Sequence, residues 1–384
     1  MRRKNILAVF GTRPEVIKLA PVIWALEKTG KYGVTSCVTA QHRGLLDQML
    51  EVFALKPRYD LDVMRKDQSP DEVMEKILRL LRPVLRKEKP DLVLVQGDTT
   101  TAVAAALAAF YHRVPVAHVE AGLRSFDPGN PYPEEVNRIL VDRLSSLWFA
   151  PTADAKENLR REAIQGPGVF VTGNTVVDAL RWALRAPGGF ESPLLRGLPR
   201  EARVILVTLH RRESFGEPLR RIFQALLEIS RRHPDVVLVY PVHPNPRVRG
   251  EARRMLGRSN IRLCEPLPYL DFLRLMDRSY LLLTDSGGLQ EEGPSLHKPV
   301  LVLRDTTERP EILRVGAGKL LGTRTSEIIA GTERLLTNRG LYLKMTRCPS
   351  PYGDGRASER IASAIGYWLG LNRRPSEWAS PARR

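Results

Sequence analysis

Short apolar runs rich in β-branched residues alternate with amphipathic stretches along most of this chain of 384 residues. This alternation restricts the fold more than any other feature of the sequence. In the first half, apolar runs at residues 6–10, 34–39, 91–96 and 114–119 predict buried strands, and the stretches between them have apolar residues at helical spacing. Strands separated by helices form βαβ units, in which the strands run parallel and helices cover both faces of the sheet. The first half therefore predicts a doubly wound α/β domain.

The same alternation restarts after a segment rich in proline and glycine at residues 186–199, which we assign as the interdomain linker. Two strands complete the first half, at residues 147–150 and 169–172. Five more are expected in the second half, at residues 204–209, 236–240, 261–264, 280–284 and 300–303. The predicted fold class is α/β, with two doubly wound Rossmann-like domains facing each other across a cleft. The expected segments are a first domain over 1–185, a second over 186–360, and a C-terminal helix and tail over 361–384 that pack back on the first domain.

Charge, cysteine content and hydropathy argue against several classes of protein. The net charge is +17, but basic residues are spread along the chain without a block or tail, so we expect no nucleic-acid partner. The longest apolar run, at residues 102–111, is half of the ~20 residues that a membrane span needs. Three widely spaced cysteines form neither a disulfide framework nor a Cys-x-x-Cys metal site. Together with the lack of a recognisable signal peptide, this predicts a reduced, cytoplasmic protein without membrane association.

Ionisable residues follow the expected strands at their carboxyl ends, where ligands meet an open α/β sheet. Asp98 and Glu120 follow the third and fourth strands, and carboxylates in a cleft serve as general acids or bases. Position alone leaves open a structural role for each, a helix cap for Asp98 and a surface ion pair for Glu120. Glu134 opens a helix after a proline-rich loop, where an acidic residue also favours the helix dipole.

A second group of candidates is suited to bind phosphate. Ser286, Gly287 and Gly288 open an expected helix, and the missing side chains let backbone N–H groups approach an anion that the helix dipole favours. A tight turn is the alternative interpretation of this segment. His210 ends a strand beside Arg211 and Arg212, so these residues add donors for phosphate oxygens, although a histidine at a strand end is often structural.

Several motifs that would indicate other chemistry are missing from the sequence. No Gly-x-Gly-x-x-Gly follows the first strand, no Walker A sequence or Gly-x-Ser-x-Gly elbow occurs, and no histidines pair at metal-site spacing. The sequence therefore predicts recognition of a nucleoside diphosphate without a redox cofactor, a kinase loop or a metal.

Eleven sequence blocks occur in a fixed order and spacing in this chain. They include Phe-Gly-Thr-Arg-Pro-Glu-Val-Ile-Lys at 10–18, His-Val-Glu-Ala-Gly-Leu-Arg-Ser at 118–125 and Thr-Asp-Ser-Gly-Gly-Leu-Gln-Glu-Glu-Gly at 284–293. The others lie at 39–43, 97–101, 133–138, 172–175, 210–216, 240–243, 305–311 and 351–355. Together the blocks resemble the non-hydrolysing UDP-N-acetylglucosamine 2-epimerase family of bacterial type, and the resemblance runs from Phe10 to about Gly355. Each block alone is a weak signal, whereas eleven in register are highly specific.

The resemblance implies the two-domain GT-B fold and an isomerase that converts UDP-N-acetylglucosamine to UDP-N-acetylmannosamine without a metal or nicotinamide cofactor. The family's catalytic positions fall on Asp98, Glu120, Glu134 and His210. Its substrate-binding positions fall on Arg13, Lys18, Phe272, Ser286, Gly287, Gly288, Glu292 and Arg309, with Glu292 at the ribose. Bacterial members also bind a second, activating UDP-N-acetylglucosamine, whose contacts match Gln41 and His42, although Gly44 lacks the amide side chain of some members. Leu209 also departs from the small residue that often precedes the histidine.

The expected reaction is an elimination and re-addition of UDP. No carbonyl lies next to C2, so the C2 hydrogen becomes acidic only after UDP leaves C1 and an oxocarbenium-like centre forms; a carboxylate then removes the proton. Expected partners are UDP-N-acetylglucosamine, UDP and a second copy of the chain in a homodimer, and the product would supply a cell-surface polysaccharide. The alternatives are a hydrolysing 2-epimerase, a 2-epimerase of a related UDP-2-acetamido sugar, a glycosyltransferase of the same fold, and a basic nucleic-acid-binding protein.

Overall fold

The computed structural model describes residues 3–40, 43–65, 68–211, 214–257 and 259–379, and the chain divides into two compact units. The first unit contains Met1–Ala179 and Tyr352–Ser380, and the second contains Leu180–Pro351. The boundaries expected at residues 185 and 360 fall a few residues after these. The first unit is therefore built from two separate stretches of chain.

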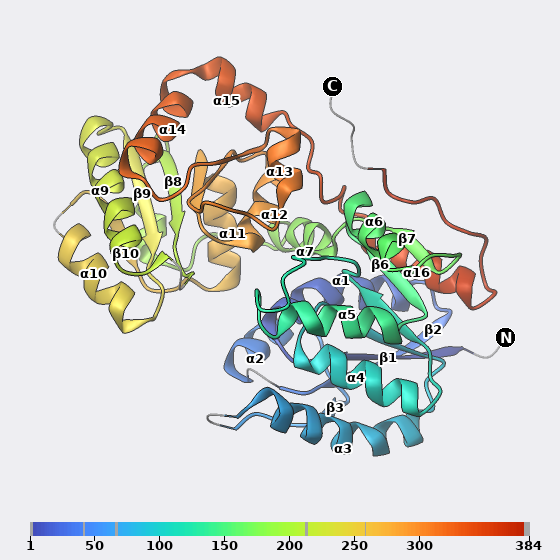
Figure 1. Cartoon of the computed structure of the whole chain (residues 1–384). Coiled ribbons are helices and arrows are strands. Elements are labelled where there is room, and N and C mark those ends of the chain that lie inside the picture. The colour runs from blue at the N-terminus through green and yellow to red at the C-terminus, as the bar shows by residue number, and fades with distance from the viewer. Residues whose placement is uncertain (1–2, 41–42, 66–67, 212–213, 258, 380–384) are drawn as a thin grey trace. The chain divides into compact units, whose positions relative to one another are not determined.

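The first unit is organised around a parallel sheet of seven strands in the order β3-β2-β1-β4-β5-β6-β7 (Figure 1). The strands are β1 (Lys4–Phe10), β2 (Tyr32–Val38), β3 (Tyr59–Asp60), β4 (Leu92–Gln96), β5 (Val116–Val119), β6 (Leu147–Ala150) and β7 (Val169–Val171). Leu7 and Val9 of β1 belong to a buried cluster with residues of three helices, and the alternate residues of the strand are buried on the other face. Burial on both faces is typical of a parallel sheet covered by helices on each side.

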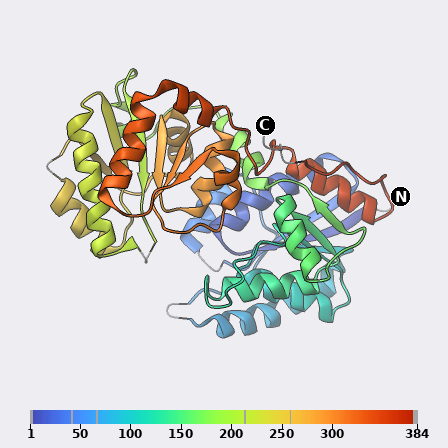
Figure 2. The same cartoon turned by 45° about the horizontal axis from the view of Figure 1, so that its top comes forward.

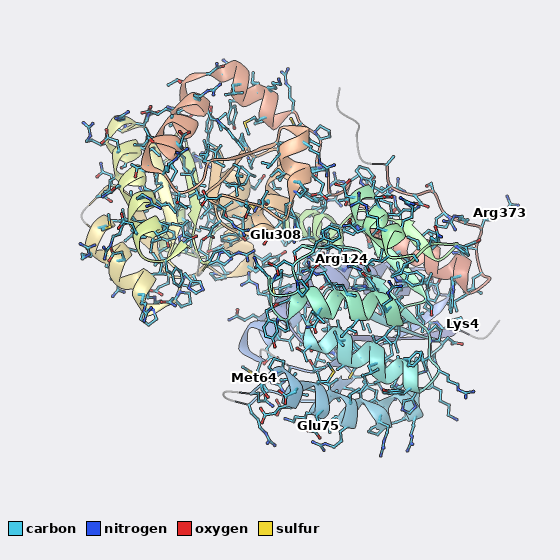
Figure 3. All side chains as sticks on the ribbon, viewed as in Figure 1. Lys4, Met64, Glu75, Arg124, Glu308 and Arg373 are labelled. Atoms are coloured by element: carbon cyan, nitrogen blue, oxygen red, sulfur yellow. The ribbon has the colours of Figure 1, made fainter. Side chains whose placement is uncertain are left out.

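Helices of the first unit pack on each other along the sheet. Figures 1 and 2 show α3 (Pro70–Glu88), α4 (Thr100–Tyr111) and α5 (Glu134–Leu144) side by side, and α1 (Arg13–Lys28) packs against α2 (Arg43–Val52) and α16 (Ala357–Trp368). Ser69 and Glu72 form a capping box that starts α3, and the exposed side of this helix carries charged residues such as Glu75 (Figure 3). The remaining helices of this unit are α6 (Ala153–Arg161) and the first part of α7 (Thr175–Leu184).

The second unit contains a parallel sheet of six strands in the order β10-β9-β8-β11-β12-β13. The strands are β8 (Arg203–Thr208), β9 (Val236–Pro241), β10 (Arg262–Cys264), β11 (Leu281–Thr284), β12 (Val300–Val302) and β13 (Gly318–Leu320). Its helices are α8 (Pro193–Arg196), α9 (Glu217–Arg232), α10 (Pro246–Leu256), α11 (Tyr269–Arg278), α12 (Gly287–Ser295), α13 (Pro310–Val315), α14 (Thr325–Thr337) and α15 (Arg339–Thr346). Ile205 and Val207 of β8 pack with apolar residues of α9, α10 and α14 on one face. Gly293 allows α12 to pack close to the sheet. Any side chain at this position would collide with Val300, because a Cβ atom would lie 2.5 Å from Val300 Cγ2.

The end of the described chain runs along the outer strand of the first sheet. The backbone N–H of Trp378 donates to the carbonyl oxygen of Val171 at 2.7 Å, and Glu377 Oε2 accepts the N–H of Val171 at 3.1 Å. Lys156 Nζ donates to the same Glu377 oxygen at 2.7 Å. These contacts cover polar backbone groups of β7, an edge strand that would otherwise leave them exposed.

The predicted pair of doubly wound parallel sheets is confirmed. Two short edge strands, β3 and β13, were not predicted, because two or three residues are too few to show a periodic pattern. Within the described residues, the helices are all too short or too polar to cross a bilayer.

Candidate active site

Two of the expected catalytic carboxylates lie at the same edge of the first sheet. Strands β4 and β5 pair in parallel with Gln96 opposite Val119, so Asp98 and Glu120 follow the two strands at neighbouring positions. Glu134 is half-buried and is the first residue of α5. The structure therefore places all three in the first unit, on the two strand ends and the helix start.

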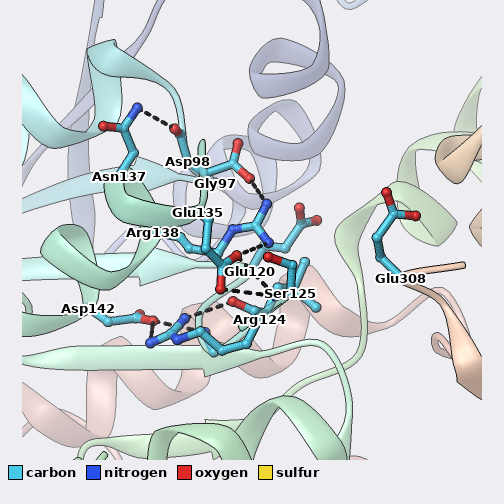
Figure 4. Close-up of polar contacts among 12 residues, drawn as sticks. Gly97, Asp98, Glu120, Arg124, Ser125, Glu135, Asn137, Arg138, Asp142 and Glu308 are labelled. Carbon is cyan, nitrogen blue, oxygen red and sulfur yellow. Dashed lines mark hydrogen bonds and ion pairs between the residues drawn. The ribbon is translucent and has the colours of Figure 1, made fainter. Parts of the chain in front are cut away.

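Helix α5 holds Asp98 through both its side chain and its backbone (Figure 4). Arg138 Nη2 donates to Asp98 Oδ2 at 2.5 Å, and Asn137 Nδ2 donates to the Asp98 carbonyl oxygen at 2.9 Å. Arg138 Nη1 also donates to the buried Glu135 at 3.0 Å, and Glu135 accepts the backbone N–H of Ser125. These contacts fix the orientation of the Asp98 carboxylate and place a guanidinium charge beside it.

Glu120 has an unusual backbone and two polar partners. Its φ of +70° is in the left-handed region, which is uncommon for a residue other than glycine and is typical of strained functional positions. Glu120 Oε2 forms an ion pair with Lys18 of α1 and accepts a hydrogen bond from Asn174 Nδ2 at 3.1 Å. Lys18, expected to bind substrate, is thus in direct contact with an expected catalytic group.

A second buried carboxylate, Glu15, joins the two loops that carry Arg13 and Asp98. Arg13 is the first residue of α1, and Glu15 Oε2 accepts the backbone N–H groups of Gly11 at 2.9 Å and of Thr12 at 2.7 Å. The hydroxyl of Thr99 donates to Glu15 Oε1 at 2.8 Å. Burial raises the pKa of Glu15 to about 7, although these donors act in the opposite direction.

A buried histidine, His118, connects the strands beneath the carboxylates. Its Nδ1 lies 2.7 Å from Asp142 Oδ1, and its Nε2 lies 2.8 Å from the carbonyl oxygen of Gly97. Asp142 also pairs with the fully buried guanidinium of Arg124 at 2.8 Å (Figure 4). The network links Gly97, the residue before Asp98, to the strand that Glu120 follows, and so restricts the position of both carboxylates.

In the second unit, His210 follows β8 and is fixed by a carboxylate. Asp285, which follows the neighbouring strand β11 and is completely buried, has its Oδ1 3.1 Å from His210 Nδ1. Burial alone would raise the pKa of Asp285, but the hydrogen bond and charge of His210 and the backbone N–H groups of Arg211 and His210 hold that pKa below its usual value.

The start of α12 lies beside this pair. Ser286 is the N-cap of α12, and Gly287 and Gly288 form its first turn. Guanidinium groups approach from two sides, since a Cβ atom at Gly287 would lie 3.6 Å from Arg211 Nη2 and 4.0 Å from Arg309 Nη2. A helix N-terminus flanked by two arginines is suited to bind phosphate groups.

The other expected contacts of the second unit belong to α11, to α12 and to the N-terminus of α13. Arg309 is the N-cap of α13 and pairs through Nε with Glu291 Oε1 at 2.5 Å, next to the half-buried Glu292 of α12. Phe272 is half-buried on α11. Gln41 and His42, expected at an activating site, lie outside the described residues.

Sequence reasoning assigned no role to Arg138, Asn174 or Asp285, and it expected Lys18 to bind substrate without predicting its contact with Glu120. Arg138 lies one helical turn after Glu134, and this spacing could have indicated that the two share a face of α5. Asn174 and Asp285 lie inside blocks of the resemblance, and Asp285 directly precedes the proposed phosphate-binding turn. For Lys18 and Glu120, which are 102 residues apart, the sequence carries no local signal of the pairing.

Comparison with known proteins places the chain in a family. The family model described as UDP-N-acetylglucosamine 2-epimerase matches residues 24–366. The chain belongs to the UDP-N-acetylglucosamine 2-epimerase family. A Yersinia pestis protein of that name is 51% identical over 370 residues, which cover 94% of this chain and 98% of that protein.

Solved structures of the epimerase family are similar to this chain over nearly its whole length. The UDP-N-acetylglucosamine 2-epimerase from Neisseria meningitidis, solved with UDP-N-acetylglucosamine bound, is 46% identical, with a TM-score of 0.86 and coverage of 95% of this chain and 100% of that chain. The Staphylococcus aureus protein MnaA, solved with UDP, is 45% identical, with a TM-score of 0.88 and coverage of 98% of this chain and 100% of that chain. The family named from the sequence blocks is therefore confirmed.

Proposed function

We propose that this protein inverts the configuration at C2 of UDP-N-acetylglucosamine and so interconverts it reversibly with UDP-N-acetylmannosamine. The observation that carries the proposal is membership of the UDP-N-acetylglucosamine 2-epimerase family over nearly the whole chain. Polar residues support it in both units, with Asp98 and Glu120 held at strand ends and two arginines at the start of α12.

The chemistry needs two kinds of groups, and each unit supplies one. The bond from C1 to the diphosphate must break first, and the negative charge that develops on UDP needs positive charges and N–H donors. His210, Arg211 and the start of α12 are suited to this task. The C2 proton must then go to a base and return to the opposite face of the sugar, which Asp98, Glu120 and Glu134 are suited to do. UDP adds back to C1 to complete the reaction.

Two cations of the first unit support the proposal that its carboxylates transfer the C2 proton. Arg138 and Lys18 each hold one carboxylate in place and balance its negative charge. A carboxylate that is fixed in direction removes a proton more effectively than one that must be ordered in each cycle. We further propose that Arg13 contacts the substrate from the first turn of α1.

A reaction with UDP-N-acetylglucosamine as the only substrate tests the proposal. We expect UDP-N-acetylmannosamine, and the product formed in D₂O should carry deuterium at C2 because a carboxylate exchanges its proton with solvent. Free N-acetylmannosamine would instead indicate a hydrolysing enzyme, and turnover only in the presence of an acceptor would indicate a transferase. Epimerised product without solvent deuterium at C2 would overturn the proton-transfer mechanism.

Oxygen exchange tests whether UDP leaves. Substrate labelled with ¹⁸O in the C1–O–P bridge should be recovered with the label also in non-bridging positions, since freed UDP returns through any oxygen of its terminal phosphate. The variant His210→Asn should slow both deuterium uptake and this exchange, because both follow departure of UDP. If the label stays in the bridge while C2 is inverted, elimination of UDP is wrong.

Three wider expectations belong to the same proposal. We propose that the protein works as a homodimer in the cytoplasm and supplies an activated sugar for cell-surface polysaccharide. Light scattering of the purified protein at micromolar concentration tests the dimer, which should have about twice the mass of the 43.3 kDa chain.

A further inference from the structure

The carboxylate of Asp285 accepts several hydrogen bonds from the segment that carries His210. Its carboxylate, with no exposed surface, accepts the backbone N–H groups of His210 and Arg211, each at 3.0 Å, and the hydroxyl of Ser214 at 3.2 Å. The imidazole Nδ1 of His210 lies 3.1 Å from the same carboxylate. One buried anion therefore fixes both the backbone and the ring of His210.

We propose that Asp285 is a positioning residue for the reaction, and that it keeps His210 as a cation whose Nε2–H is directed away from Asp285 toward the departing diphosphate. The inference rests on the proposed function, because it assumes that His210 stabilises the charge on UDP. Asp285 itself is buried behind the ring and acts only through His210.

The hydrogen-bond chemistry sets the proton positions. An ionised carboxylate only accepts hydrogen bonds, so His210 Nδ1 must carry a proton to donate to it. A buried negative charge at 3.1 Å also stabilises a positive charge on the ring, which leaves a second N–H at Nε2. That N–H is on the opposite side of the ring, and 39% of the His210 side chain is exposed.

The other charged groups near His210 do not replace Asp285. The ring of His243, which follows β9, has its centroid 6.4 Å from the centroid of the His210 ring. Burial and the nearby His210 lower the pKa of His243, whereas the charge of Asp285 acts in the opposite direction. His243 Nδ1 also accepts the backbone N–H of Asn245 at 3.3 Å. Arg211 is paired with Glu308 at 3.6 Å. Asp285 therefore contacts His210 directly, whereas burial favours the neutral form of His243.

Replacement of Asp285 by asparagine separates positioning from packing. The asparagine carbonyl can still accept the backbone N–H groups, but its amide NH₂ would face Nδ1, which must then accept a proton instead of donating one. The ring becomes neutral, with a proton only on Nε2. We expect kcat of Asp285→Asn to fall about 10- to 100-fold, while KM changes less than threefold, because the lost charge matters most when UDP leaves.

The controls separate this effect from a general loss of structure. Asp277→Asn makes the same change at an exposed position of α11, and we expect its kcat to stay within threefold of the wild-type value. The double variant Asp285→Asn/His210→Asn should be no slower than His210→Asn alone, because a residue that acts through another adds nothing once its partner is gone. If kcat of the double variant fell by the product of the two single-variant losses, the proposal would be overturned.

A spectroscopic measurement on the wild-type protein keeps the proposal testable even if Asp285→Asn does not fold. In ¹⁵N-histidine NMR spectra of the UDP complex, the His210 ring should carry protons on both nitrogens. A ring without a proton on Nδ1 would refute the inference. If the wild-type protein makes no UDP-N-acetylmannosamine, the proposed function fails, and the NMR result still decides whether Asp285 holds His210 as a cation.

Discussion

At the scale of single residues, two of the three expected catalytic carboxylates, Asp98 and Glu120, are already paired with cations before a substrate arrives. Arg138 holds Asp98, and Lys18 holds Glu120, whose left-handed backbone directs its side chain. The sequence could place Asp98 and Glu120 because the alternation of strands and helices shows where strands end. It could not predict their cations, because Arg138 and Asp98 are 40 residues apart and meet only through the packing of α5 on α4 and β5.

Removal of the carboxylates should affect the chemical step. We expect Asp98→Asn, Glu120→Gln and Glu134→Gln each to lower kcat by about 10²-fold or more, the usual contribution of a positioned acid or base. The measurement is epimerisation followed by NMR, with folding checked by circular dichroism. Glu75→Gln, on the exposed side of α3, is the matched control and should keep the wild-type rate. Near-wild-type rates in two of the three variants would show that these residues do not form the site.

Glu15 should make the stability of the first unit depend on pH. Burial raises its pKa from the usual 4.5 to about 7, so the folded protein keeps a proton that the unfolded chain has lost. The stabilisation from this proton is complete below about pH 4.5 and is lost as pH rises through about 7, by about 3 kcal/mol in all.

The variant Glu15→Gln imitates the protonated carboxyl, since its carbonyl can accept from Gly11 and Thr12 and its amide can donate to Thr99. We therefore expect the free energy of unfolding of the wild-type protein, relative to this variant, to fall between pH 4.5 and 7. Urea unfolding followed by tryptophan fluorescence measures it, because Trp24, Trp148, Trp368 and Trp378 all lie in the first unit. A difference that is the same at both pH values would contradict the assignment.

At the scale of elements, long amphipathic helices and central strands could be predicted, and short edge elements could not. The helix expected from Ser286 begins there in the structure, with Ser286 as its N-cap, a position that serine favours. β3 and β13 depend on neighbouring strands for their conformation, so their own residues carry little information. The guanidinium groups around α12 also come from separate segments, and local patterns do not show that they converge.

A methyl group at the start of α12 should block UDP without disturbing the fold. A Cβ atom at Gly287 would meet only ordinary contacts, at 3.6 Å from Arg211 Nη2 and 4.0 Å from Arg309 Nη2, so Gly287→Ala should fold normally. UDP at 100 times its Kd stabilises a protein by about 2.7 kcal/mol, and we expect most of this effect to be lost in the variant.

Thermal unfolding with and without ligand measures the effect. In the wild-type protein, UDP should raise the Tm more than UMP, because two phosphates interact with α12 and its arginines. Gly250→Ala is the matched control, since Gly250 lies on α10 with no atom within 4 Å of its Cβ position. A full UDP effect in Gly287→Ala would mean that the diphosphate binds elsewhere.

At the scale of the whole molecule, the second unit is an insertion into the first. The chain leaves the first unit after Ala179 and returns at Tyr352. The return is fixed by Asp178, whose Oδ1 accepts the backbone N–H of Ser358 at 2.8 Å at the start of α16. Repetition of the βαβ pattern predicted two domains from the sequence, but the point of return depends on contacts between residues about 180 positions apart.

Because the second unit is continuous, it should fold alone. We expect a protein of residues 180–351 to unfold cooperatively by circular dichroism, and UDP should raise its Tm. The same fragment with His210→Asn should show a smaller increase. Residues 1–179 alone should not fold stably, because Ile361 and Ile365 of α16 are missing from the interior of that unit. A fragment 180–351 without cooperative unfolding would show that this unit depends on the rest of the chain.

The inserted position of the second unit also determines the order in which the protein matures during translation. The ribosome must add the 172 residues from Leu180 to Pro351 before α16 emerges to cover α1, which takes about 10–30 s at 5–20 residues per second. The second unit is thus completed before the first, and until α16 emerges the apolar surface of α1 in the nascent chain stays uncovered. The protein is therefore most prone to capture by chaperones or to aggregation after Pro351 has been added and before α16 has emerged, and loss of α16 would damage mainly the first unit.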